Sequence, residues 1–242
     1  MAIFVLVAGA WHGGWCWERI VPLLEAGGHR VIAPDLLGMG ADRTPLGEVS
    51  LARWADQVAA LIRAQDEPVI LVGHSRGGIV ISEVAERVPD QIASLVYLAA
   101  YLLPDCETIM SMSAKSERTS PAGLLIMAPD GTATLNPALV GQHFYNTTEP
   151  DWVDRALSLV GAEPMVTMTT QVSLTVERFG SVRRAYIACE RDQAVPLSLQ
   201  RLMQQALPCD PVFTLPGDHS PFYSDPGRLA DCLKQLAVSI TQ

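Results

Sequence analysis

The six residues 73–78 have the types and spacing of a nucleophilic site. They read Gly-His-Ser-Arg-Gly-Gly, so Ser75 has one glycine two residues before it and another two residues after it. A strand-like apolar run at residues 68–72 precedes them, and a helix-like run at residues 79–87 follows. A serine in this setting lies on a strained turn that exposes its hydroxyl, and the glycines let the backbone approach itself closely. The pattern predicts that Ser75 attacks a carbonyl carbon.

A serine nucleophile needs a histidine to remove its proton. In a strand–turn–helix site of this kind the chain order is serine, acid, histidine, and only two of the five histidines follow Ser75. His143 falls in an expected helix, whereas His219 falls in a polar turn after the last expected strand. Because active groups gather at the carboxyl ends of parallel strands, we predict that His219 is the base. We expect structural roles for the other three histidines, His12, His29 and His74.

The base needs a carboxylate to orient it, and we predict that Asp192 supplies it. Asp192 lies in the loop that follows the expected strand at residues 185–189. Glu190 in the same loop and Asp105 after the preceding strand remain alternatives. Asp218 is discounted, because side chains of adjacent residues rarely point at each other.

The reaction also needs backbone donors for a developing oxyanion. We predict that these are the N–H groups of Arg76, next to the nucleophile, and of Ala10, in the loop after the first strand. Gly9 is small enough to let the backbone approach a substrate, and Trp11 is a candidate for the wall of the acyl pocket. The Arg76 side chain faces either the pocket, where it would bind a polar or anionic group, or an acidic neighbour.

The pattern of apolar runs predicts an α/β fold that positions these groups. Short apolar runs alternate with amphipathic ones, which indicates a six-stranded, mostly parallel sheet with helices on both faces. The expected strands are residues 3–7, 30–33, 69–72, 93–99, 185–189 and 211–215. The expected helices are residues 15–25, 51–64, 79–87, 198–206 and 227–239.

The alternation stops at residues 104–180, which are richer in Ser, Thr, Met and Pro. We expect this segment to be an inserted helical cap, with helices at residues 137–145 and 151–160, over a core formed by residues 1–103 and 181–242. Several of its apolar or aromatic residues are candidates for a substrate pocket: Met127, His143, Phe144, Trp152, Leu159 and Met168. Of these, Trp152 is the one that we assign to substrate binding.

Composition excludes several classes of protein. The net charge is -9 with scattered basic residues, which argues against nucleic acid or an anionic membrane as a partner. No signal peptide is visible and no apolar run could span a bilayer. The five cysteines form no C-x-x-C pair and none has a metal-ligand spacing with histidine. We therefore expect a cytoplasmic protein that needs no metal and no other cofactor.

The sequence resembles a known family. Residues 5–17, Val-Leu-Val-Ala-Gly-Ala-Trp-His-Gly-Gly-Trp-Cys-Trp, resemble the opening of plant methylesterases. Residues 34–40 look like the P-D-L-x-G-x-G loop of that group, and residues 179–187 resemble the entry to its acid strand. The resemblance covers nearly the whole chain, is weakest at residues 104–135, and extends to hydroxynitrile lyases and bacterial pyrethroid-type esterases. It implies an α/β-hydrolase fold with a helical cap and a Ser75–His219–Asp192 triad.

Two positions depart from the family pattern. Ala8 stands where the family usually has histidine, and Arg76 places a large charged side chain at a variable position. The lyases use a threonine and a lysine to handle cyanide, and Gly9 and Ser220 stand at the matching positions here. Neither can supply that chemistry, which favours ester hydrolysis.

We therefore predict a serine carboxylic ester hydrolase that forms an acyl-enzyme from small to medium apolar or aromatic esters. The alternatives are a hydrolase of a thioester or C–C bond on the same triad and a ligand-binding protein with a vestigial triad. Haloalkane dehalogenation is disfavoured, because it needs an aspartate where Ser75 stands. The oligomeric state stays open between a monomer and the cap-mediated homodimer found in similar proteins.

Overall fold

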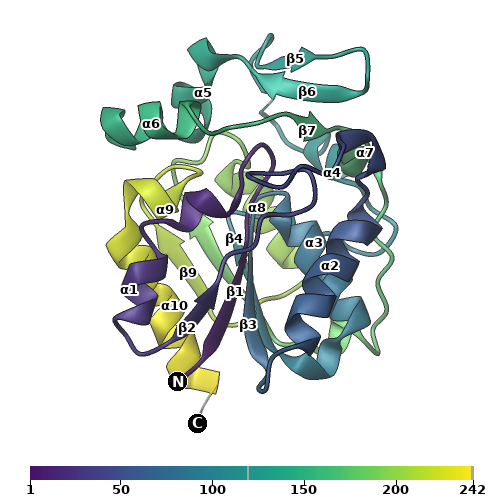
Figure 1. The fold of residues 1–242 in the computed structure, drawn as a ribbon, viewed down its shortest axis with the longest axis vertical. Coiled ribbons are helices and arrows are strands. Elements are labelled where there is room, and N and C mark those ends of the chain that lie inside the picture. Colours follow the sequence, from purple (N-terminus) through teal and green to yellow (C-terminus); the bar gives the residue numbers. More distant parts are fainter. Residues whose placement is uncertain (119, 241–242) are drawn as a thin grey trace.

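A six-stranded sheet runs through the centre of this computed structural model, which describes residues 1–118 and 120–240 (Figure 1). The strand order is β2-β1-β3-β4-β8-β9, and every neighbouring pair is parallel, as expected. The strands are β1 (Ile3–Val7), β2 (Arg30–Ile32), β3 (Val69–His74), β4 (Ile92–Leu98), β8 (Arg184–Cys189) and β9 (Val212–Leu215). Parallel neighbours need long crossover connections, and helices provide most of them.

Helices cover both faces of this sheet. Helix α1 (Val21–Glu25) contacts α10 (Pro226–Ile240) on one side, and α2 (Leu51–Arg63) contacts α3 (Gly77–Arg87) on the other (Figure 1). The core also contains α8 (Leu197–Ala206), α9 (Pro221–Ser224) and the 3-10 turns η1 (Gly14–Trp17), η2 (Leu46–Glu48), η3 (Pro89–Gln91) and η4 (Phe179–Ser181). The helix expected at residues 15–25 is split into η1 and α1, because Pro22 lacks the N–H that a continuous helix would use.

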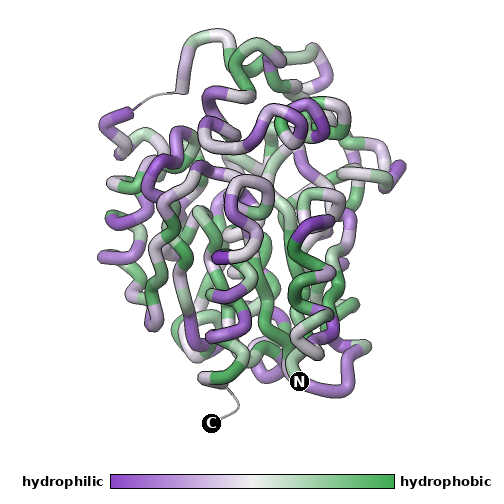
Figure 2. The backbone as a smooth tube through the Cα atoms, turned by 90° about the vertical axis from the view of Figure 1, so that its left-hand side faces the viewer, coloured by the Kyte–Doolittle hydropathy of each residue, from purple (hydrophilic) through white to green (hydrophobic). Residues whose placement is uncertain are grey.

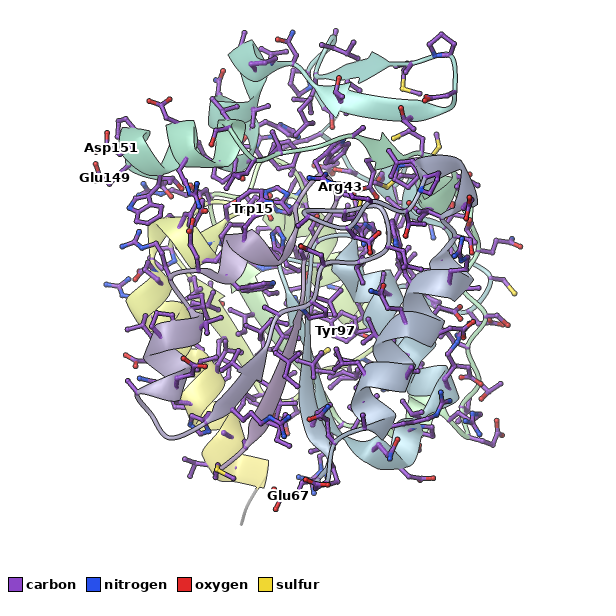
Figure 3. All side chains as sticks on the ribbon, in the orientation of Figure 1. Trp15, Arg43, Glu67, Tyr97, Glu149 and Asp151 are labelled. Atoms are coloured by element: carbon purple, nitrogen blue, oxygen red, sulfur yellow. The ribbon has the colours of Figure 1, made fainter. Side chains whose placement is uncertain are left out.

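The apolar sequence runs form the interior. All residues of β1 and β3 are buried, which explains why these strands are apolar throughout rather than alternating. Figure 2 shows the hydrophobic segments gathered inside the sheet-containing part of the molecule. Tyr97 of β4 lies in this interior (Figure 3), where its hydroxyl and that of Ser82 are 2.8 Å apart.

Residues 104–172, which we call the cap, lie over one end of the sheet (Figure 1). Residues 173–180, which we expected to belong to the cap, run beside α3 of the core, where the N–H groups of Ser173 and Thr175 donate to Glu83 and Glu86. Glu149 and Asp151 lie at the outer edge of the cap, and Trp15 lies where the cap meets the core (Figure 3). Besides the helices α4 (Ile109–Ser113), α5 (Pro137–Phe144), α6 (Pro150–Leu157) and α7 (Val166–Thr169), the cap contains an antiparallel sheet of β5 (Leu125–Met127), β6 (Thr132–Leu135) and β7 (Glu163–Pro164). The expected helical cap therefore also contains a small sheet that the sequence did not predict, because strands of two to four residues are too short to show a periodic pattern.

Candidate active site

Ser75 lies on a strained turn between β3 and α3. Its φ is 53°, in the left-handed region that residues with a side chain rarely adopt. A Cβ on Gly73 would lie 2.6 Å from the carbonyl oxygen of Gly77, so a side chain there is excluded. The Ser75 carbonyl accepts the N–H groups of Gly78 and Tyr101, at 3.0 Å each, which fixes the turn. The predicted strand–turn–helix arrangement is present.

His219 and Asp192 form a buried pair. The His219 Nδ1 atom lies 2.7 Å from Asp192 Oδ2, and the histidine is 1% exposed. The other carboxylate oxygen accepts the N–H groups of Ala194 and Val195, at 2.8 Å each. Gln200 donates to Asp192 Oδ2 at 3.2 Å. Gln200 was not predicted from the sequence, since its place in the middle of α8 gives no signal of this contact.

The rival acids lie elsewhere. Glu190 and Asp105 are exposed, and Asp105 accepts the Leu174 N–H instead. Asp218 is buried, but its Oδ2 accepts hydrogen bonds from the cap, including the N–H of Thr147 at 2.8 Å. Its Oδ1 accepts the Ser220 N–H and the Ser224 hydroxyl rather than a bond from His219. Of the carboxylates weighed from the sequence, the structure places Asp192 against His219.

The turn that carries Ser75 contacts the loop that carries His219. His74 Nε2 donates to the His219 carbonyl at 2.8 Å, and the two rings lie 4.6 Å apart. Burial holds the pKa of His74 well below its ordinary value, so the ring is neutral. Within the described chain, no hydrogen bond joins the Ser75 hydroxyl to His219. Such bonds often tighten only when substrate binds.

Two backbone N–H groups are free to bind an oxyanion. Ala10 and Arg76 both line the cavity beside Ser75, and in the part of the chain that the structure describes their N–H groups have no hydrogen-bond partner. Arg76 also precedes the first residue of α3, where helix amides favour negative charge. Both N–H groups are therefore available to stabilise an oxyanion beside Ser75.

His12 fixes the loop that carries Ala10. Its Nδ1 lies 2.6 Å from the Ala10 carbonyl oxygen and its Nε2 lies 2.5 Å from the Tyr145 hydroxyl. Burial lowers the pKa of His12 to about 4, so the ring is neutral and donates at one nitrogen while it accepts at the other. A structural role was expected for His12, and these two contacts define it: the ring joins the Ala10 carbonyl to the Tyr145 hydroxyl.

The burial of the neutral His12 ring predicts that acid destabilises the fold. The unfolded chain protonates His12 below about pH 6.5, whereas the folded chain does so only near the lowered pKa of about 4. The free energy of unfolding should therefore be highest above pH 6.5 and should lose about 3 kcal/mol as pH falls to about 4 from this group alone. Urea unfolding at several pH values would measure the slope. His12→Gln should flatten it, the more exposed His29→Gln should change it less, and equal slopes in His12→Gln and the wild type would contradict the account.

A cavity of about 100 Å³ adjoins Ser75 under the cap. Its walls are mainly apolar or aromatic, as substrate sites usually are; these side chains are Trp11, Tyr101, Ile109, Leu124, Leu125, Phe144 and Met168. His143 also lines it, is 6% exposed, and has a pKa lowered to about 4, mainly by burial. Of the predicted pocket residues, Trp11, His143, Phe144 and Met168 are therefore in place.

Other predicted pocket residues lie outside the cavity walls. Trp152 packs against Tyr223, with ring centroids 5.0 Å apart, and the Arg19 guanidinium lies 4.4 Å from its ring. Its assignment to substrate binding is corrected, because α6 directs it toward the core. Met127 is exposed on β5, and Leu159 does not line the cavity. Gly9 is not a wall residue either; it packs beneath Ser75, where a Cβ would lie 2.9 Å from the serine Cβ.

The Arg76 side chain turns away from the cavity. Its Nε lies 3.0 Å from Glu163 Oε1, and its Cζ lies 4.1 Å from the centre of the Trp54 ring. Of the two environments considered, the acidic neighbour is the one observed. Among residues 1–118 and 120–240, no cluster of side chains suits a metal ion, and no helix is long and apolar enough to cross a membrane.

Known proteins are similar to this chain in both sequence and fold. Residues 4–232 match the model of the alpha/beta hydrolase family. The chain is 32% identical to methylesterase 7 of Arabidopsis thaliana over 97% of this chain and 95% of the relative. It is 33% identical to salicylic acid-binding protein 2 of Nicotiana tabacum over 97% and 96% of the two chains.

A solved structure agrees with these matches. A pyrethroid hydrolase from Sphingobium faniae JZ-2 superimposes with a TM-score of 0.85 at 30% identity, covering 98% of this chain and 97% of the other. The chain belongs to the alpha/beta hydrolase family. Proteins named as esterases or as a pyrethroid hydrolase are thus among those that it resembles over nearly its whole length.

Proposed function

We propose that the protein is a serine carboxylic ester hydrolase of the carboxylesterase type. The observation that carries the proposal is the buried His219–Asp192 pair, held next to the strained turn that presents Ser75 to a covered apolar cavity. The relatives named as a methylesterase and as a pyrethroid hydrolase support the same activity.

The reaction begins when Ser75 Oγ attacks the ester carbonyl carbon and its proton passes to His219 Nε2. Asp192 stabilises the resulting imidazolium through Nδ1–H. The negative charge on the former carbonyl oxygen is bound by the N–H groups of Ala10 and Arg76. When the tetrahedral intermediate collapses, the alcohol leaves with the proton from His219.

Water completes the cycle. His219 takes a proton from a water molecule while the water oxygen attacks the carbonyl carbon of the acyl-enzyme. The oxyanion of the second tetrahedral intermediate is bound by the same two N–H groups. Its collapse releases the carboxylic acid, and Ser75 regains its proton from His219. No metal or cofactor enters any step.

The cavity favours small to medium apolar or aromatic esters. Its walls are mainly apolar, and three aromatic rings, those of Trp11, Tyr101 and Phe144, face the substrate space. Two polar residues of the cap, the neutral His143 and Ser120, also line it. We also propose a reducing, cytoplasmic setting, which the five free cysteines support, and leave open whether the protein is a monomer or a homodimer.

A substrate panel tests the function. Purified protein would be assayed with aryl, methyl and long-chain esters beside matched thioesters and vinylogous diketones. We expect the highest kcat/KM with short aryl and apolar methyl esters. Preference for thioesters or for C–C cleavage would support the second candidate chemistry. Tight ligand binding without turnover of any of these compounds would instead indicate a binding protein.

A further inference from the structure

A buried ion pair joins the cap to the turn that carries the nucleophile. Arg76 and Glu163 are 1% and 0% exposed, and Arg76 Nε lies 3.0 Å from Glu163 Oε1. Glu163 belongs to β7, so the pair links segments that are 87 residues apart in sequence. The mechanism proposed above uses the Arg76 backbone, but it uses neither of these two side chains.

The same pair holds the loop of the oxyanion hole on both sides of Ala10. Arg76 Nη2 donates to the Gly9 carbonyl at 2.9 Å, and Glu163 Oε2 accepts the Trp11 N–H at 3.0 Å. The Gly9 carbonyl belongs to the same peptide group as the Ala10 N–H. The Ala10 carbonyl, held by His12, and the Trp11 N–H belong to the next peptide group, so contacts on both groups set the direction of the Ala10 N–H.

Trp11 shows why the loop needs such contacts. Its φ is 63°, a left-handed conformation that is strained for a tryptophan. Besides Glu163, two further cap groups hold it: the Ala133 carbonyl accepts its indole N–H, and its own carbonyl accepts the Gly161 N–H, at 3.0 Å each. Strain of this kind persists only where surrounding contacts impose it, and here the cap supplies three of them.

We propose that Arg76 and Glu163 are positioning residues that form the oxyanion hole only when the cap is docked. This inference rests on the proposed esterase function and deepens it. Without the pair, the Gly9–Trp11 loop would relax from the strained conformation, and the Ala10 N–H would point away from the developing oxyanion. The loss should therefore fall on the transition state rather than on substrate binding.

The test replaces Arg76 and Glu163 together, so that neither charge is left buried alone. A single neutral substitution would leave the other charge buried without a partner, whereas replacing a whole buried pair by apolar residues is often tolerated. Arg76→Met/Glu163→Leu removes the pair and the acceptor for the Trp11 N–H. Arg76→Met/Glu163→Gln removes the same charges but keeps a side-chain oxygen for that N–H. Arg155→Met is the control, because it breaks a partly exposed ion pair between cap and core, to Glu18, away from the loop.

The readouts separate positioning from stability. Each variant would be checked for folding by circular dichroism and thermal unfolding, then assayed for kcat and KM with p-nitrophenyl butyrate. A trifluoromethyl ketone, which forms an oxyanion on a serine, would report the affinity of the donor pair. The product acid would report ground-state binding.

We expect kcat of Arg76→Met/Glu163→Leu to fall about 10²-fold with KM nearly unchanged. The ketone should bind weaker by the same factor, and the product acid should bind as before. Arg76→Met/Glu163→Gln should retain a higher kcat and a higher affinity for the ketone than the leucine variant. Arg155→Met should match the wild type in both.

Wild-type kcat in the folded Arg76→Met/Glu163→Leu variant, or equal losses in the two double variants, would overturn the inference. If the leucine variant does not fold, unchanged kcat and ketone affinity in the glutamine variant would overturn it, because that variant still loses the Gly9 contact. A wild-type protein that hydrolyses no ester would refute the proposed function instead.

Discussion

Replacing Ser75 by alanine is expected to lower kcat for ester hydrolysis by about 10⁶-fold while KM changes little. The side chain is small and lines the cavity, so its loss removes the attacking oxygen without disturbing the core. The remaining rate would come from the donor pair and the binding of substrate. Steady-state assays with p-nitrophenyl butyrate at high protein concentration would measure it.

Ser82 offers a matched control. It lies on α3, near Ser75 in sequence, but its hydroxyl donates to the Gly78 carbonyl and lies beside Tyr97 in the interior. Ser82→Ala should keep kcat near the wild-type value, with at most some loss of thermal stability. Comparable losses of kcat in both variants would point to disturbed folding and would remove the case for Ser75 as the nucleophile.

Asp192→Asn is expected to lower kcat by about 10⁴-fold. The N–H groups of Ala194 and Val195 both donate to Oδ1, so the amide oxygen of an asparagine would stay with them. Its NH₂ group would then face His219 Nδ1, which would have to accept rather than donate. The proton of the ring would move to Nε2, where it blocks acceptance of the Ser75 proton. The pH–rate profile and kcat of the variant would measure this.

The two rival acids serve as controls for that prediction. Asp105→Asn and Glu190→Gln alter exposed side chains that do not contact His219, and both should retain nearly wild-type kcat. If kcat fell as much in Asp105→Asn or Glu190→Gln as in Asp192→Asn, the assignment of Asp192 as the acid would be wrong. Wild-type kcat in Asp192→Asn would have the same consequence.

Local signals explain what the sequence predicted well. The four inner strands of the central sheet are short apolar runs, because burial on both faces removes the need for alternation. The edge strands β2 and β9 are only partly buried, but they too were found within one or two residues. The turn at Ser75 was visible because its geometry demands glycine at fixed positions. The pairing of His219 with Asp192 followed from where their loops leave a parallel sheet.

Contacts between distant segments explain what was missed. Gln200 reaches Asp192 from the middle of a helix, and Glu163 reaches Arg76 from a two-residue strand, so neither has a local pattern. Trp152 was misassigned because an aromatic residue on an amphipathic helix looks the same whether it faces a pocket or the core. The strands of the cap were missed because runs of two to four residues are too short to show a periodic pattern.

The central claim is that a strained serine, activated by a buried histidine–carboxylate pair, attacks the ester. Reaction with a fluorophosphonate, followed by peptide mass spectrometry, tests it most directly. The account predicts a single adduct on Ser75, activity lost in proportion to labelling, and no adduct in Ser75→Ala. An adduct on another residue that abolishes activity, or undiminished ester hydrolysis by fully labelled protein, would contradict it.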